Sequence, residues 1–501
     1  MGDLVKVGLR RALLALGLAV VSVSLPAGGA AGKASPSVEA ALRDHISILA
    51  SDDFGGREPG TEGEQKTLRY LAKEWFEMGL VSGTNDPGNA WFAPVRVVER
   101  VPDKSFASFE RGRRRLTATQ DGILILTSGA RNLVENAPLL FVGRADGPLP
   151  TRTELAGRIA VLLDGPNGAA AAAGEDRQSA LLAGGAAAVL TVLDGPRTLE
   201  DVAARRHRAG YALAEDSVGG DLEGFMSPAI AARVLGAPLA DLARSADAAG
   251  FVPRPLGVNA TLEATTRETR INTHNLIGKL PGRQPAKGAV LLVAHWDHFG
   301  TCAAPPAEDL ICNGAVDNAS GLAVITEVAR ALARGKPLDR DVYLLATTAE
   351  ELGLLGAEAF AENPPLPLDQ IVAAFNVDSD ALAPAGRPLA IVGHGKTGLD
   401  ADILRLAKSL KRTVEGNPVA DSFLRRQDGW ALLRHDIPTV MVSSSYSDPV
   451  RLEKFMEDTY HRPSDQAGPG LELGGAADDV GFHIAMVRWF ADAKKFPAKA
   501  R

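Results

Sequence analysis

The second half of the chain alternates short apolar segments with amphipathic ones, and this pattern restricts the possible folds more than any other feature of the sequence. Three segments after about residue 260 are typical of buried strands: "GAVLLVAH", "DVYLLATTA" and "QIVAAFNVD". Two segments between them have the apolar spacing of helices: "GLAVITEVARALARG" and "GLLGAEAFAE". Alternation of this kind predicts an α/β domain with a mixed, largely parallel sheet sandwiched by helices.

Further elements are expected on both sides of this region. A helix around residues 399–411, a strand at "IPTVMVS" and a closing helix at "DDVGFHIAMVRWFADAKK" extend the pattern toward the C-terminus. Near the N-terminus, residues 37–80 indicate two helices separated by a turn rich in Gly, Pro and Thr. The second of these helices spaces its apolar residues as one buried stripe: Leu68, Leu71, Trp75 and Met78.

The middle of the chain has a different texture. From about residue 115 to 255 there are short apolar runs such as "APLLFVG" and "RIAVLLD", separated by Gly-rich and Ala-rich turns. A chain of 501 residues also exceeds one ordinary core. We therefore predict a smaller, β-rich domain at 115–255 inserted between 36–114 and 256–497, which together form the larger domain.

The charge balance excludes one class of partner. The net charge is −7, and the longest basic run is "RGRRR". Nucleic-acid binding usually needs a concentrated basic face, so nucleic acid is not an expected partner.

The first 30 residues indicate export. Lys6, Arg10 and Arg11 precede the apolar run "ALLALGLAVVSVSL", which the small residues "PAGGAAG" follow. This order is that of a secretory signal peptide. The apolar run is shorter than the roughly 20 residues that span a bilayer, so no membrane anchor is expected after cleavage. The expected location is periplasmic or extracellular, where Cys302 and Cys312 are more readily a disulfide than two free thiols.

Polar side chains follow three of the predicted strands at the same end. His295, Asp297 and His298 come directly after the first strand, Glu350 and Glu351 after the second, and Asp378 after the third; Asp317 precedes the helix at 321. Open α/β sheets place ligand sites beyond the carboxyl ends of their strands, so these residues are expected to form one cluster.

Each of these residues has an ordinary alternative explanation. An Asp before a helix is usually a cap, and a lone His is more often a satisfied polar side chain than a ligand. Several buried carboxylates at one edge, however, are costly unless a cation neutralises them. Imidazole and carboxylate ligands without cysteine suit catalytic zinc, and manganese or cobalt also accept them.

The number of ligands favours two metals, with Asp317 as the candidate bridge. Neighbouring side chains that leave a strand point in different directions. One carboxylate of the pair Glu350 and Glu351 is therefore expected to bind metal, and the other to act as a general base toward water.

Five segments, taken in order, resemble the M28 family of di-zinc peptidases in its bacterial aminopeptidase branch: "AHWDH", "GAVDNASG", "TTAEELGLLGAEAF", "NVDSD" and "DTYHRPSD". "ASDDFGGREPGTEGEQ" and "HNLIGKLPGR" are also similar to segments of that family. The resemblance implies the zinc-dependent exopeptidase fold, and it identifies residues 115–255 as a protease-associated (PA) domain.

The resemblance also implies a role for each site residue. His295, Asp317 and Asp378 would bind one zinc, and Asp317, Glu351 and His461 the other. Glu350 matches the general base. Asp297 matches an acid that orients His295, and Tyr460 matches a tyrosine that stabilises the oxyanion. Two departures stand out: Val316 replaces an acid common in the family, and Gly429 replaces a His after Asp428.

The expected function is a zinc aminopeptidase acting on the N-termini of peptides or proteins. A carboxypeptidase or another amide hydrolase is the alternative on the same fold. Asp380 is the candidate to receive an α-ammonium group, and Arg425 or Arg426 to receive a carboxylate. A non-catalytic binding protein is a third hypothesis, which the complete ligand set disfavours. The sequence assigns no oligomeric state.

Overall fold

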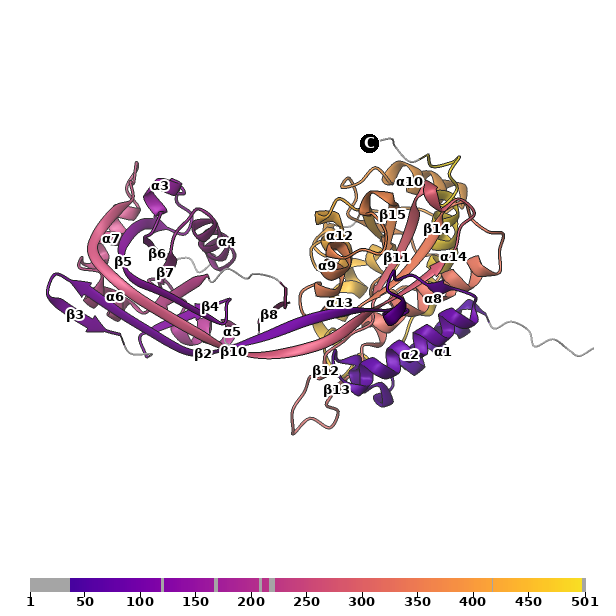
Figure 1. The fold of residues 1–501 in the computed structure, drawn as a ribbon, viewed down its shortest axis with the longest axis horizontal. Coiled ribbons are helices and arrows are strands. Elements are labelled where there is room, and N and C mark those ends of the chain that lie inside the picture. The colour runs from indigo at the N-terminus through magenta and orange to yellow at the C-terminus, as the bar shows by residue number, and fades with distance from the viewer. Residues whose placement is uncertain are drawn as a thin grey trace, which may run out of the picture. The chain divides into compact units, whose positions relative to one another are not determined.

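Two long strands, β2 (Phe92–Arg111) and β10 (Arg254–Leu280), pair antiparallel over most of their length (Figure 1). The computed structural model describes residues 37–118, 121–165, 170–206, 210–215, 221–416 and 418–497. The predicted signal peptide, residues 1–30, lies outside these ranges. Val38–Arg501 form one unit by their internal contacts.

The predicted parallel sheet is present and mixed. Strands β11 (Ala289–His295), β14 (Asp341–Thr347), β15 (Ile371–Asn376) and β17 (Thr439–Ser443) pair in parallel in the order β17-β15-β11-β14. Strand β16 (Ala390–Val392) joins one edge antiparallel to β17, and β10 pairs antiparallel with β14. Every residue of β11 and β14 is buried, which explains why both read as continuous apolar runs.

Helices cover both faces of this sheet, as the alternating pattern predicts. Even-numbered side chains of β11 and β14 pack with α1 (Val38–Leu49), α2 (Glu62–Glu77), α8 (Gly321–Ala333) and α14 (Leu473–Phe490). Odd-numbered side chains pack with α9 (Leu355–Glu362) and α12 (Asp428–Arg434) on the opposite face. Figure 1 shows α9 and α12 on one side of β11 and β14, and α8 and α14 on the other.

The remaining elements of this region are short. Helices α10 (Asp400–Ser409), α11 (Pro418–Asp421) and α13 (Pro449–Asp458) follow β16, and β1 (Val81–Ser82) pairs with β10. No helix among the described residues is long and apolar enough to cross a membrane.

The segment from 115 to 255 has apolar clusters of its own. Strands β5 (Arg131–Arg144), β6 (Ile159–Leu163), β7 (Ala188–Val192) and β9 (Leu222–Met226) pair in parallel, with β4 (Ile123–Thr127) antiparallel at the edge. The described helices here are α3 (Arg152–Leu155), α4 (Ala170–Ala183), α5 (Leu199–Arg206), α6 (Pro228–Val234) and α7 (Leu239–Ala246). Strands β3 (Arg114–Thr117) and β8 (Gly210–Leu213) pair with β2.

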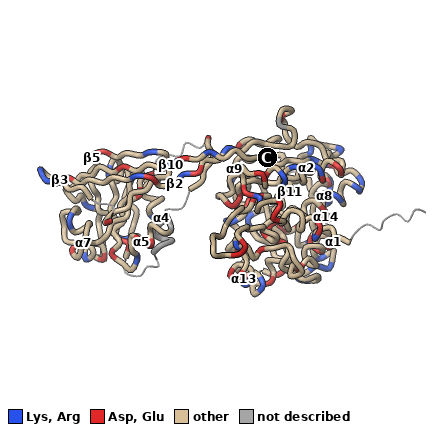
Figure 2. Tube along the Cα trace, turned by 90° about the horizontal axis from the view of Figure 1, so that it is seen from below, with Lys and Arg blue, Asp and Glu red and all other residues tan. Residues whose placement is uncertain are grey.

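The predicted domain boundary at 255/256 falls inside β10, which continues without a break to Leu280. The identity of this segment as a PA domain stays a prediction. Lysines and arginines are interspersed with acidic residues along the described chain (Figure 2).

The predicted stripe on α2 is the contact that attaches this helix to the sheet. Leu68, Leu71 and Trp75 are buried, and Met78 is partly buried at the end of the stripe. The Trp75 indole Nε1 donates a hydrogen bond to Thr326 Oγ1 on α8 at 3.1 Å. Trp75 therefore joins the N-terminal helices to the helix that follows Asp317.

We expect Trp75→Ala to lower the free energy of unfolding by about 3–5 kcal/mol, because it opens a cavity and removes the hydrogen bond to Thr326. The neighbouring Phe76 is 68% exposed, so Phe76→Ala should change stability by about 0.5 kcal/mol or less. Denaturant titrations of the two variants measure the contrast. Equal losses would mean that the stripe does not secure α2.

Candidate metal centre

The predicted ligands meet at the carboxyl edge of the parallel strands. His295 is the last residue of β11, Glu350 and Glu351 follow β14, and Asp378 follows β15. Asp317 lies in the segment just before α8. Parallel strands all end at this edge, which is the physical reason that residues far apart in the sequence converge.

The Asp317 carboxylate lies between two histidines. His295 Nε2 is 3.2 Å from Asp317 Oδ1 and 3.6 Å from Asp378 Oδ1. On the other side, His461 Nε2 is 3.3 Å from Asp317 Oδ2 and 3.0 Å from Glu351 Oε2. Asp317 therefore lies between a His295–Asp378 pair and a His461–Glu351 pair, with one of its oxygens facing each histidine.

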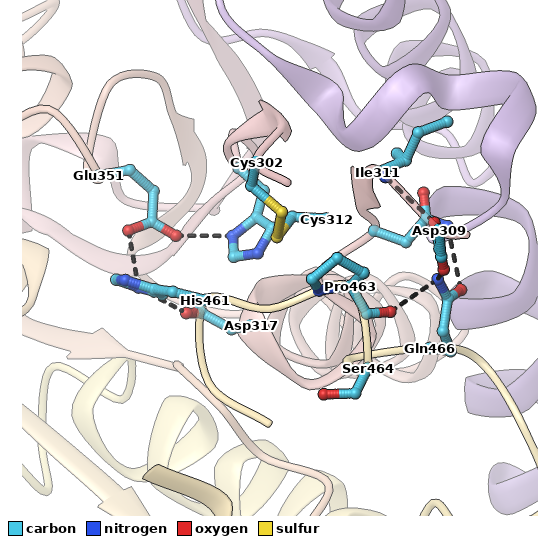
Figure 3. Close-up of a disulfide and its surroundings, with 12 residues drawn as sticks. Cys302, Asp309, Ile311, Cys312, Asp317, Glu351, His461, Pro463, Ser464 and Gln466 are labelled. Carbon is cyan, nitrogen blue, oxygen red and sulfur yellow. Dashed lines mark hydrogen bonds and ion pairs between the residues drawn. A yellow bond between two sulfur atoms is a disulfide. The ribbon is translucent and has the colours of Figure 1, made fainter. Parts of the chain in front are cut away.

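Only the resemblance assigns His461 to a metal, and in the structure this residue lies beside Asp317 and Glu351. Figure 3 shows the His461 and Glu351 side chains directed toward one another, with Asp317 beside His461. His461 itself has a positive φ of 57°, and Ala349 and Ser379, each next to a site carboxylate, have a φ of 52°. Left-handed backbone at residues other than glycine is unfavourable, and it occurs here at three positions bordering one site.

Burial of several carboxylates gives the site unusual acidities. Burial raises the pKa of Glu350 well above its ordinary value, despite the opposing effect of His295. For His295, burial lowers the pKa, but Glu350, Asp317 and Asp378 outweigh burial and raise the pKa well above the usual value. These directions mean that the cluster demands positive charge, which protons or divalent cations can supply in competition.

The donor atoms fit divalent metals. Ligand atoms of His295, Asp317 and Glu351, and of His295, Glu350 and Asp378, all lie within 4.8 Å of one another in each group. The His461 Nε2 is buried, and its contacts with the two carboxylates lack hydrogen-bond geometry. A ring nitrogen aimed between carboxylates without a proper hydrogen bond fits a metal ligand, and a nitrogen and oxygen donor set suits zinc.

Asp297 is at the site, but it makes different contacts from those expected. The resemblance to the M28 family implies that its carboxylate orients His295. In the structure, His295 Nδ1 is 3.1 Å from the backbone carbonyl oxygen of Asp297 and 3.9 Å from its Oδ1. The hydrogen bond from Nδ1 to the carbonyl leaves the Nε2 lone pair facing the acids. The carboxylate instead accepts hydrogen bonds from the amides of Glu350 and Glu351, at 3.1 and 3.3 Å.

His298 contributes a contact that sequence reasoning did not assign. Its side chain is buried, and its Nδ1 donates to Glu351 Oε1 at 2.6 Å. The other oxygen of Glu351 faces His461. The sequence places His298 in the expected cluster after the first strand but gives it no partner. Such an outer partner fixes the orientation of a metal-binding carboxylate.

Tyr460 lies against the site. Its ring stacks on the His461 ring, with centroids 3.5 Å apart. Burial and the neighbouring carboxylates of Asp317 and Glu351 raise the pKa of Tyr460, so its hydroxyl keeps its proton. Arg426 lies above the Tyr460 ring, with its guanidinium carbon 5.6 Å from the centroid.

The two other acids considered from the sequence are not open to a ligand. Asp380 is fully buried and accepts a hydrogen bond from Ser443, so it does not present a carboxylate for an α-ammonium group. Asp428 is also fully buried and accepts a hydrogen bond from Thr347; burial raises its pKa to about 6. Asp428 is therefore held by Thr347, the last residue of β14, and is closed to a ligand.

The expected disulfide is present. Cys302 and Cys312 are bonded, with their Cα atoms 5.7 Å apart, and join β12 (Gly300–Thr301) to β13 (Ile311–Cys312) (Figure 3). Neither cysteine is therefore available as a metal ligand. The bond closes the loop that leads directly into the segment carrying Asp317.

We expect His298→Ala to weaken metal binding by about 10- to 100-fold, because Glu351 loses the partner that orients it. His435 offers a matched control. Its Nε2 contacts Glu358 Oε2 at 2.8 Å in a histidine–carboxylate pair outside the site. Titration of each purified variant with zinc against a competing chelator measures the effect. Equal affinities in the two variants would mean that His298 does not position Glu351.

Part of the chain matches a known protein family. Residues 275–470 match peptidase family M28. No curated protein matches the chain. Among solved structures, an aminopeptidase from Aneurinibacillus sp. strain AM-1 superposes with a TM-score of 0.50 at 17% identity, covering 90% of this chain and 93% of that one. This likeness supports the same fold beyond the family match.

Two further solved structures are similar at lower scores. A zinc aminopeptidase from Bacillus subtilis has a TM-score of 0.46 at 18% identity, covering 92% of this chain and 97% of that one. A peptidase M28 precursor from Shewanella amazonensis SB2B has 0.44 at 16%, covering 91% and 96%. Residues 275–470, which match peptidase family M28, contain every candidate ligand, so the likeness to this family of peptidases covers the whole candidate metal centre.

Proposed function

We propose that this chain is a zinc-dependent aminopeptidase that hydrolyses the N-terminal peptide bond at a two-metal centre. The observation that carries the proposal is the position of Asp317, whose two carboxylate oxygens face two separate histidine–carboxylate groups. In this proposal His295, Asp317 and Asp378 bind one zinc, and Asp317, Glu351 and His461 bind the other. Three carboxylates leave two divalent ions with a net positive charge, which favours a developing oxyanion.

When bound, the two zinc ions supply Lewis acidity that activates water and polarises the scissile carbonyl. Glu350 is the general base: it accepts a proton from the attacking water and passes it to the leaving amine. Burial raises its pKa, which brings this carboxyl closer to the pH at which it must both accept and release a proton. The Tyr460 hydroxyl keeps its proton and donates a hydrogen bond to the oxyanion.

Asp297 acts on this chemistry through the backbone. Its carboxylate accepts hydrogen bonds from the amides of Glu350 and Glu351, so it orients the base and a zinc ligand together. Its carbonyl selects the His295 tautomer whose Nε2 is free to bind zinc. Asp297 is a positioning residue for both metals.

The site has two candidate substrates, the amino end and the carboxyl end of a peptide. The Aneurinibacillus neighbour is named an aminopeptidase, which favours an α-ammonium group at the bound end of the substrate. A carboxypeptidase is the second candidate, because Arg426 lies beside Tyr460 and could bind a terminal carboxylate. The chain's substrates are then the free ends of peptides or proteins.

We also propose that the protein works outside the reducing cytosol, in the periplasm or the extracellular space. The disulfide between Cys302 and Cys312 supports this location, because such bonds persist in oxidising compartments.

Metal content and chelation test the two-metal proposal. We expect about two zinc ions per purified chain by elemental mass spectrometry. We also expect hydrolysis of leucine 4-nitroanilide that chelation abolishes and added zinc restores. Cleavage of N-blocked peptides with a free carboxylate, without cleavage of the nitroanilide, would favour the carboxypeptidase. A metal-free, inactive protein would favour a binding protein instead.

Glu350→Gln tests the base. We expect this variant to retain two zinc ions and to lose about 10²- to 10⁴-fold in kcat, because the amide cannot accept the proton. Glu362→Gln is the control, since Glu362 is exposed at the end of α9 and should leave kcat unchanged. Retained turnover in Glu350→Gln would remove Glu350 from this role.

A further inference from the structure

Arg57 is a fully buried cation beneath the candidate metal centre. Its Nε donates to the Trp296 carbonyl at 2.8 Å, and its Nη1 donates to the carbonyls of Leu49 and Asn313 at 2.9 and 2.6 Å. Its Nη2 donates to the Gly314 carbonyl at 2.9 Å. The guanidinium is therefore surrounded by backbone oxygens, and no carboxylate makes a direct ion pair with it among the described residues.

Asp465 binds the same loop from the other side. Its Oδ1 accepts a hydrogen bond from the amide of Val316 at 2.9 Å, and its Oδ2 accepts one from the amide of Asp317 at 3.0 Å. Its own carbonyl accepts the amide of Ala315 at 3.2 Å. Asp465 is buried, and it lies four residues after His461 in the sequence "HRPSD".

Arg57 and Asp465 therefore bind opposite backbone groups of the same five residues, 313–317. Arg57 donates to the carbonyls of Asn313 and Gly314, and the Asp465 carboxylate accepts from the amides of Val316 and Asp317. Each charged side chain binds the end of the peptide dipole that carries the opposite partial charge. Hydrogen bonds to a charged group are stronger than those between neutral groups. The loop fits closely, because a Cβ on Gly314 would lie 2.0 Å from the Asp317 carbonyl oxygen.

We propose that Arg57 and Asp465 form a clamp that holds Asp317 with one carboxylate oxygen toward each metal. Arg57 also donates to the carbonyl of Trp296, the residue after His295. The clamp therefore sets the distance between His295, a proposed ligand of the first metal, and Asp317, the proposed bridge. Asp465 ties the same bridge to the loop of His461. The inference rests on the proposed two-metal function, and both residues are positioning residues that touch neither metal nor substrate.

The alternative is that Arg57 stabilises the fold and has no effect on metal binding. Arg340 is a matched control for that role. It is equally buried, and it donates to the carbonyls of Lys287 and Phe490, each at 2.7 Å. Arg340 lies just before β14, whereas the site lies after the seven residues of that strand, a distance of roughly 20 Å.

Asp465 has a matched control as well. Asp341 is a buried carboxylate at the start of β14 that accepts a hydrogen bond from the amide of Gly282 at 2.7 Å. Its replacement by Asn removes the same kind of contact at the edge of the sheet opposite the site.

The test compares zinc affinity, by titration against a competing chelator, with the unfolding temperature of the metal-free protein. We expect Arg57→Met and Asp465→Asn to bind zinc about 10- to 100-fold more weakly than the wild type. Arg340→Met and Asp341→Asn should lower the unfolding temperature without shifting zinc affinity. Arg57→Lys should fall between, because an ammonium group keeps the charge but not the fork of donors.

A double variant tests whether the two residues act together. If both hold one loop, Arg57→Met with Asp465→Asn should lose less zinc affinity than the product of the single losses. Should Arg57→Met not fold, Arg57→Lys and Asp465→Asn carry the same test.

Two outcomes overturn the inference and can be told apart. Wild-type protein that binds no divalent metal removes the proposed function and the clamp with it. Wild-type protein with two zinc ions, whose affinity is unchanged in Arg57→Met and Asp465→Asn, removes the clamp alone and leaves both residues with a purely structural role.

Discussion

The mutual repulsion of buried carboxylates is the constraint around which this site is built. Asp317, Asp378, Glu350 and Glu351 end within one small region at the carboxyl edge of the sheet, where little water screens their charges. Such a group is stable only with compensating positive charge. His295 and His461 provide part of it, and each of these histidines faces one carboxylate oxygen of Asp317.

The scaffold resists the relaxation that would relieve this repulsion. Strands β11 and β14 are buried along their whole length and packed by helices on both faces, so the points from which the acids emerge cannot separate. The connecting loops are held by backbone hydrogen bonds to side chains rather than by regular structure. Asp297 binds the loop of Glu350, and Asp465 binds the loop of Asp317. A site made of rigid strand ends and bound loops is preorganised for a metal.

Residues from distant parts of the chain bind the loops of the candidate metal centre. Arg57 comes from the turn between α1 and α2, far in sequence from every ligand, yet its donors end on the loops after β11 and β13. The disulfide closes the loop just before Asn313. The N-terminal helices are therefore part of the support of the metal centre and not only a cover of the sheet, since Trp75 attaches them to α8.

The sequence by itself determined the alternation of strands and helices and the edge at which the acids gather, because periodicity and strand ends are local properties. It favoured a disulfide between its two cysteines, and the structure shows that bond. Tertiary structure alone decided the contacts among the site residues. It gave His295 a backbone carbonyl as its partner, turned the Asp297 carboxylate toward two amides and buried Asp380. It also paired His298 with Glu351 and brought Arg57 and Asp465 to the site. Those contacts depend on the directions in which side chains leave separate loops, and no local sequence pattern predicts these directions.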